Sequence, residues 1–114
     1  MHQTEAKPFT QAPILVGVGM AMQREEDWRD AVEPLALMER SVRQAADDCG
    51  VPALLAEVER IAVPKGRWHY ADPAGAIAAA IGARRATTLL ATVGVLQQTL
   101  IGDEIGRASC RERV

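Results

Sequence analysis

The sequence predicts a layered α/β fold with a mainly parallel sheet and helices on both faces. Short apolar runs rich in β-branched residues alternate three times along the chain with segments of helical spacing. Apolar runs of this length, without polar alternation, are typical of strands that are covered on both faces. The order strand, helix, strand, helix, strand, helix therefore indicates parallel strands joined by crossover helices.

The first strand is predicted over Ile14–Gly19, an apolar run that ends in glycine. Residues 1–12 before it show no periodicity, so we expect a flexible arm there. Residues 23–30 after it are mostly charged. That composition favours a surface loop, with Trp28 as its candidate anchor.

The most clearly marked helix begins at Pro34 and stops before Gly50. Its charged residues fall on one face and its apolar residues on the other, at positions 35, 38, 42, 45 and 49. Proline is common in the first turn of a helix and glycine just past the last turn, as found here. For residues 51–56 we predict a connector or a short helix.

The second strand is predicted over Ile61–Val63, and a loop is predicted after it over residues 65–70. Asp72 is then placed as the N-cap of a second helix, because aspartate side chains accept hydrogen bonds from the free N–H groups of a first turn. Pro73 takes the first helical position, and Gly82 ends the helix.

The third strand is predicted over residues 86–92 and a third helix over residues 94–102. The helical segment carries no charged side chain on any face. A helix of this composition is usually buried, so we expect it between the layers of the fold.

The last ten residues, Ile105–Val114, read codon for codon as a translated sequencing adapter. We therefore predict an artefact tail over 105–114, and a truncated domain over 13–104 in which Asp103 is the last residue of the protein itself. The alternative is a solvated basic C-terminal tail.

Without this tail the chain is mildly acidic. The net charge is −2, and the tail carries three arginines and one glutamate, which leaves −4 for the rest. The remaining basic residues are scattered singly, which argues against a nucleic-acid partner. No uncharged run reaches the roughly twenty apolar residues of a membrane span. Cys49 is the one cysteine before the tail, which is typical of a reducing compartment, so a cytoplasmic protein is expected.

Several segments carry a family resemblance through their order and spacing: Ile14–Gly19, Glu33–Met38, Gly66–Pro73, Ala86–Thr88 and Val93–Gln98. Together they resemble the N-terminal half of the thiolase family, nearest the acetyl-CoA acetyltransferase-like or sterol-carrier-type branch. The resemblance implies a thiolase-like fold and a homo-oligomeric parent that acts on acyl-CoA thioesters without a bound cofactor. Its reaction would be Claisen condensation or thiolytic cleavage.

The resemblance places Val93 where the family has its nucleophilic cysteine, at the turn between a strand and a buried helix. A helix N-terminus at that turn lowers the pKa of a thiol and stabilises the thiolate. Valine offers no nucleophilic atom, so no catalytic residue is predicted and the chain is expected to be inactive. The family's histidine and second cysteine belong to its C-terminal half.

Other features have weaker functional interpretations. Gly17-Val18-Gly19 is similar to a dinucleotide-binding turn, but Met22 stands at the third glycine position. His69, between two aromatic residues, is either a ligand contact or a partly buried loop residue. No metal site is predicted, because His2, His69 and Cys49 lack metal-ligand spacing. Cys49 is expected to be a small core residue.

Two hypotheses from different functional classes remain open. In the first, the chain is an inactive fragment of a thiolase-like acyl-CoA acyltransferase. In the second, it is a non-catalytic thiolase-fold protein that binds acyl-CoA or a partner subunit. A downstream half with the family's histidine and cysteine would favour the enzyme, and its absence would favour the binding protein. An unrelated α/β domain is a third alternative.

Overall fold

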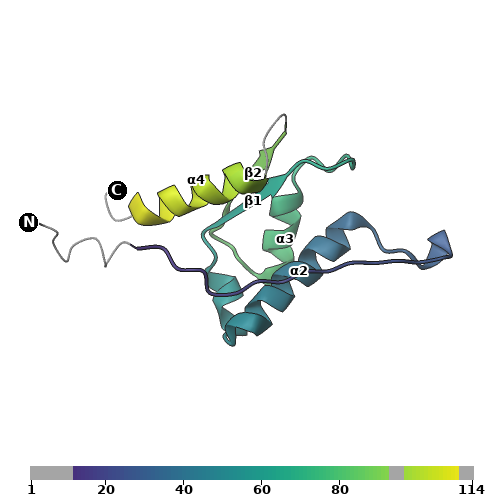
Figure 1. Cartoon of the computed structure of the whole chain (residues 1–114), viewed down its shortest axis with the longest axis horizontal. Coiled ribbons are helices and arrows are strands. Elements are labelled where there is room, and N and C mark those ends of the chain that lie inside the picture. Colours follow the sequence, from purple (N-terminus) through teal and green to yellow (C-terminus); the bar gives the residue numbers. More distant parts are fainter. Residues whose placement is uncertain (1–11, 93–96, 111–114) are drawn as a thin grey trace, which may run out of the picture. The chain divides into compact units, whose positions relative to one another are not determined.

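The computed structural model describes residues 12–92 and 97–110 (Figure 1). The chain divides into two units, one of residues 16–93 and one that combines residues 1–15 with 94–114. The predicted arm over 1–12 lies outside the described residues except for Ala12, and so does Val93.

Strands β1 (Arg60–Pro64) and β2 (Thr87–Ala91) form a two-stranded parallel sheet in the first unit. Arg60 pairs with Thr87 and Pro64 with Ala91, so both strands end at the same edge. The second and third predicted strands are confirmed, each to within one residue at either end. We call the edge at Pro64 and Ala91 the carboxyl edge of the sheet.

Helix α3 (Pro73–Ile81) joins the two strands and packs against both of them. The Asp72 side chain accepts a hydrogen bond from the N–H group of Gly75 at 3.0 Å, as predicted for an N-cap. The helix ends at Gly82, whose φ of 78° is a left-handed conformation that glycine adopts without steric cost. This predicted helix is confirmed at both of its ends.

Helix α2 (Pro34–Cys49) confirms the helix predicted from Pro34, and it packs against α3. It ends at Gly50 with a φ of 85°. The Arg43 guanidinium donates to the carbonyl oxygen of Ala80 at 2.9 Å. Carbonyls in the last turn of a helix have no partner within it, so this bond satisfies one such group of α3 and ties the helices together.

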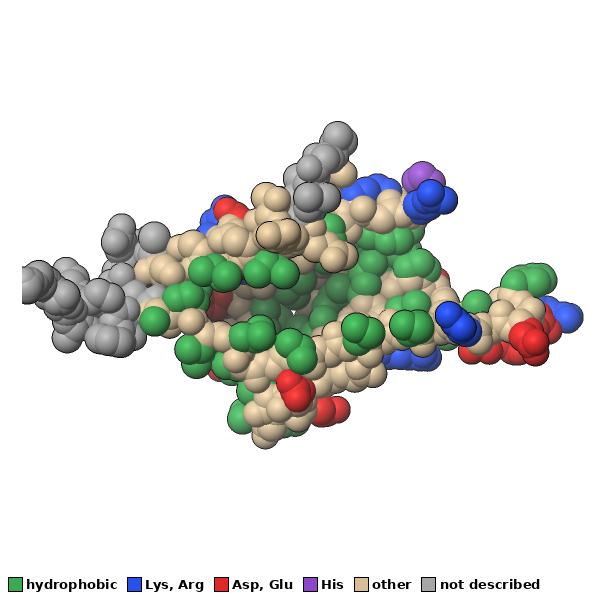
Figure 2. Space-filling model, in the orientation of Figure 1, with side chains coloured by type: hydrophobic (Ala, Val, Ile, Leu, Met, Phe, Trp, Pro, Cys, Tyr) green, Lys and Arg blue, Asp and Glu red, His purple; other side chains and the backbone are tan. Residues whose placement is uncertain are grey.

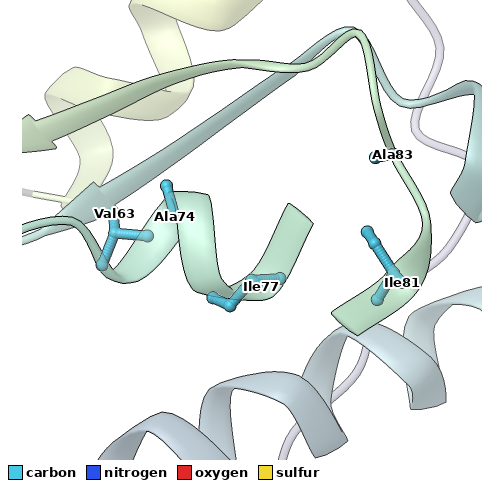
Figure 3. Close-up of a cluster of buried hydrophobic side chains, with 5 residues drawn as sticks. All are labelled: Val63, Ala74, Ile77, Ile81 and Ala83. Atoms are coloured by element: carbon cyan, nitrogen blue, oxygen red, sulfur yellow. The ribbon is translucent and has the colours of Figure 1, made fainter. Parts of the chain in front are cut away.

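A buried cluster centred on α3 forms the core of the first unit (Figure 3). Partly buried apolar residues of α2 and of β1 pack around it. The core thus links α2, α3 and the sheet. Its members are Val63, Ala74, Ile77, Ile81 and Ala83.

The predicted strand over Ile14–Gly19 is wrong, because these residues pair with no strand in the described part of the chain. The stretch from residue 16 onward lies beside α2 instead. The N–H groups of Val18 and Met20 donate to the side chains of Asp48 and Gln44 of α2, each at 3.0 Å. Side chains of a helix thus occupy donors that a neighbouring strand would otherwise use.

Glycine allows this stretch to approach α2 closely. A Cβ atom on Gly17 would stand 2.2 Å from the carbonyl oxygen of Ala45, and one on Gly19 would stand 2.1 Å from that of Ser41. The residues that alternate with the glycines are exposed, and apolar side chains are visible along this stretch in Figure 2. Four large ones, at alternate positions, are at least half exposed: Val16, Val18, Met20 and Met22.

Two short 3-10 helices flank α2. The first, η1 (Trp28–Asp30), lies in the predicted surface loop, but Trp28 is 80% exposed and anchors nothing, which corrects that prediction. The second, η2 (Pro52–Glu57), is the short helix predicted after Gly50 and packs against α2.

Helix α4 (Gln97–Cys110) belongs to the second unit and confirms the predicted helix over residues 97–102, whereas residues 94–96 lie outside the described residues. It extends past residue 102 and includes an ion pair of Arg107 with Asp103 at 3.1 Å. Within this helix Leu100 is buried and Ile101 is 61% exposed, and the expected position between the layers of the fold remains a prediction. The adapter origin of residues 105–114 and a covering of both sheet faces by helices remain predictions. None of the helices in the described residues has the length and apolarity to cross a membrane.

We expect Ile77→Ala to lower the free energy of unfolding by about 2–5 kcal/mol, because the side chain is 3% exposed and its removal leaves a cavity. Urea denaturation followed by circular dichroism measures the loss. Val51→Ala, at a position that is 52% exposed, is the control and should change stability by no more than about 0.5 kcal/mol. Equal losses in the two variants would contradict the assigned core.

We expect Gly17→Ala to displace the stretch from α2, because the new Cβ would overlap the Ala45 carbonyl. Local opening should then expose Cys49, whose Cβ lies 3.2 Å from the same Cβ position. Alkylation of Cys49 in a Cys110→Ser background should become several-fold faster. Gly102→Ala, which meets no atom within 4 Å, should leave the rate unchanged. An unchanged rate in both would refute the contact.

Candidate functional site

The carboxyl edge of the sheet is the candidate functional site. In parallel sheets, ligands usually bind outside the carboxyl ends of the strands. The loop Lys65–Tyr70 leaves this edge from β1, and the chain leaves it from β2 toward Val93. The main-chain N–H of Lys65 donates to the carbonyl of Ala91 at 2.7 Å, which continues the strand pairing into the loop.

The Lys65 side chain organises the loop from within. Its ammonium donates to the carbonyl oxygens of Gly66, at 2.9 Å, and of Trp68. It also lies 4.9 Å from the centroid of the Trp68 ring, within the range of a cation–π interaction. A Cβ on Gly66 would stand 2.4 Å from the indole nitrogen of Trp68, so the turn requires glycine. The Lys65 side chain therefore makes these contacts within the loop itself.

Two aromatic residues connect the loop to α2. The rings of Trp68 and Tyr70 are 5.2 Å apart and inclined by 31°. The Tyr70 hydroxyl accepts from the N–H of Leu35 at 3.3 Å and donates to the Glu33 carboxylate at 3.2 Å. These bonds satisfy a free N–H group in the first turn of α2. Hydrogen bonds thus hold the loop to the sheet at Lys65 and to the start of α2 at Tyr70.

Arg67 and His69 are the exposed functional groups of this loop, and Figure 2 shows basic side chains and a histidine gathered together. Neither has a hydrogen bond or ion pair within residues 12–92 and 97–110. The exposure of His69 corrects the partly buried alternative, and contact with a ligand remains a prediction. An arginine and an imidazole can bind an anion such as a phosphate. Neither side chain is a thiol.

The other residues that were considered as site candidates lie outside this loop. Cys49 is half-buried and free, and it stands fourteen residues along α2 from Leu35, a separation of about 21 Å at 1.5 Å per residue. The described part of the chain holds no cluster of three or more residues that could bind a metal ion. Val93, at the expected nucleophile position, lies outside the described residues.

The pKa of Asp27 is lowered, chiefly by a hydrogen bond from the Arg29 side chain at 3.0 Å and further by the Arg29 main-chain N–H at 3.0 Å. Both residues belong to the exposed turn at η1. This charge pair stabilises a surface turn and has no partner at the carboxyl edge.

The structure also contains an apolar groove that was not predicted from the sequence. An apolar groove of about 230 Å³ lies among the stretch that includes Val16 and Gly17, helix α2 and η2. Its residues come from three separate parts of the sequence. The one signal available was the helical apolar face at positions 42, 45 and 49, which predicts burial but not a groove.

No protein-family model matches this chain, and comparisons with curated proteins and with solved structures give no match.

We expect Lys65→Met to lower the free energy of unfolding by about 1–2 kcal/mol, because it removes charged hydrogen bonds and a cation–π contact. Chemical denaturation followed by Trp68 fluorescence, in a Trp28→Phe background, measures the change. Arg67→Met is the matched control and should alter stability by no more than about 0.5 kcal/mol. A larger effect at Arg67 than at Lys65 would reverse the assigned roles.

Proposed function

We propose that this chain is a portion of a thiolase-like acyl-CoA acyltransferase and is itself without acyltransferase activity. The family assignment rests on the resemblance of its segments to the N-terminal half of thiolases. The reaction class of the parent is Claisen condensation or thiolysis of acyl-CoA thioesters.

The parallel pairing of β1 and β2 is the observation that best supports this proposal. It brings the loop after β1 and the segment that leads to Val93 out of the same sheet edge. Acyl transfer by the family needs a thiolate at the corresponding position, and valine has no atom that can accept an acyl group. The exposed Arg67 and His69 offer anion binding at that edge.

The same two exposed groups also favour a second candidate function, a non-catalytic thiolase-fold protein that binds acyl-CoA. Coenzyme A carries phosphates, for which an arginine is a suited partner. This candidate needs a folded scaffold with an anion-binding loop but needs no nucleophile.

We expect the purified chain to show no thiolysis of acetoacetyl-CoA above a heat-denatured sample, because position 93 lacks a thiol. A spectrophotometric thiolysis assay, with an active thiolase as the positive control, measures this. Activity above the heated sample would overturn the proposed inactivity.

Two further arms separate the enzyme from the binding protein. The coding sequence is read past the codon for Asp103, and the longer product is assayed for thiolysis. Activity together with a downstream histidine and cysteine supports the acyltransferase. An inactive product that binds coenzyme A in calorimetry, and loses this binding in Arg67→Ala, supports the binding protein. A product with neither property rejects both.

A further inference from the structure

A loop that the proposed function does not use projects from the start of helix α2 (Figure 1). We call residues 23–32 the Trp28 loop. The Gln23 side chain closes its base, because its amide nitrogen donates to the Val32 carbonyl at 2.7 Å and its amide oxygen accepts from the Val32 N–H at 2.9 Å. At the tip, the Asp27 carboxylate accepts from the main-chain N–H of Arg29 and pairs with its guanidinium, each at 3.0 Å. The loop thus carries its own hydrogen bonds at both its base and its tip.

The tip of the Trp28 loop presents an indole to solvent, since the Trp28 side chain is 80% exposed. An aromatic side chain on a turn that is already hydrogen-bonded loses little conformational entropy when a partner covers it. Tryptophan is also among the residues that contribute most to the affinity of protein interfaces. The loop is therefore suited to contact another protein surface.

The charges of this loop define the surface that fits it. It contains four acidic and two basic residues, which gives a net charge of −2, and Figure 2 shows acidic side chains gathered here. Asp27 and Arg29 neutralise each other. The exposed carboxylates of Glu25, Glu26 and Asp30 have no ion pair within residues 12–92 and 97–110. The complementary group must pair with a carboxylate and stack on an indole, and arginine does both.

The same chain presents such a group on the loop of residues 65–70. This loop has two basic residues and no acidic one, a net charge of +2 with neutral histidine. Lys65 makes its contacts inside the loop, whereas Arg67 is exposed. The Tyr70 hydroxyl donates to the carboxylate of Glu33, the residue that directly follows the Trp28 loop, at 3.2 Å. The acidic and the basic loop therefore lie at the same end of α2.

We propose that two copies of this chain pair about a two-fold axis, with the Trp28 loop of each copy seated on the 65–70 loop of the other. Because both loops lie at one end of α2, a two-fold axis generates the same contact twice. Arg67 of one copy stacks on the Trp28 indole of the other and donates to the carboxylates of Glu25 and Glu26. The inference goes beyond the proposed function and does not rest on it.

The expected dimer is weak and sensitive to salt, because exposed ion pairs add little by themselves and are screened. Sedimentation equilibrium over about 1 µM to 1 mM spans the affinities of such interfaces. A reducing agent keeps Cys49 and Cys110 from linking copies, and coenzyme A is left out, so the result is independent of the proposed function. Trp28→Ala should weaken the dimer at least about tenfold.

Charge reversal tests the pairing of the two loops. One variant carries Glu25→Arg with Glu26→Arg, and a second variant carries Arg67→Glu. Each alone should stay monomeric, because like charges then meet at both contacts. An equimolar mixture should dimerise again with about the affinity of the parent chain, since reversed charges meet at one contact and the original charges meet at the other. A loss of folding in either variant could not produce this recovery.

Asp47→Arg with Glu57→Arg is the matched control for the double variant. It changes the net charge by the same amount at two exposed positions, one in the last turn of α2 and one at the end of η2. Both positions are away from the end of α2 that carries the two loops. This control should dimerise as the parent chain does.

The proposal is overturned by a parent chain that stays monomeric at about 1 mM, by a mixture that stays monomeric, or by an equal loss of the dimer in the control. A dimer that persists in Trp28→Ala and in both charge variants uses another surface and overturns it as well. A series of assemblies larger than the dimer would contradict the two-fold arrangement, because a two-fold pair leaves neither loop free.

Discussion

The burial of helix α3 between the strand pair and helix α2 is the contact on which the first unit depends. This helix has nine residues, none of them charged, and so short a helix is marginal in water by itself. Its stability must come from tertiary packing, and Ile77 and Ile81 supply the largest buried side chains of the cluster on this helix. Its alanines let neighbouring elements approach closely. The strands in turn gain a covered face, which two paired strands need in order to persist.

The elements that sequence reasoning located correctly are those with chemical signals at their ends. Asp72, Pro73 and Gly82 bracket α3, and Pro34 and Gly50 bracket α2, because capping depends on local backbone geometry that a residue imposes wherever it stands. The stretch over Ile14–Gly19 has no comparable local constraint. Its composition indicates an extended chain, but pairing with a strand depends on a partner elsewhere. Here the partners are Asp48 and Gln44, which lie 30 and 24 residues from Val18 and Met20.

The candidate site was predicted in outline only. The loop over residues 65–70 and its histidine were identified from the sequence, whereas the internal role of Lys65 was not. A lysine three residues before a tryptophan is compatible with many conformations, and the cation–π contact exists only once the loop has folded over Gly66. The groove was even harder to predict from the sequence, because its lining residues, which lie between positions 16 and 58, meet only through the tertiary fold. Long-range contacts of this kind leave no local pattern.

The chemistry of the described residues bears on the two proposed functions. Acyl transfer needs a nucleophile and a group that moves its proton, held close together and shielded from water. Arg67 and His69 are exposed to solvent, where charge interactions are strongly weakened. Cys49 lies at the C-terminal end of α2, about 21 Å along that helix from Leu35, which the loop contacts through Tyr70. Binding makes lower demands, since a phosphate needs an accessible cation and an acyl chain needs an apolar surface. An accessible cation is present in the loop at Arg67, so the described residues are compatible with the proposed binding of an anion at the carboxyl edge, which asks only that the loop keep this side chain exposed.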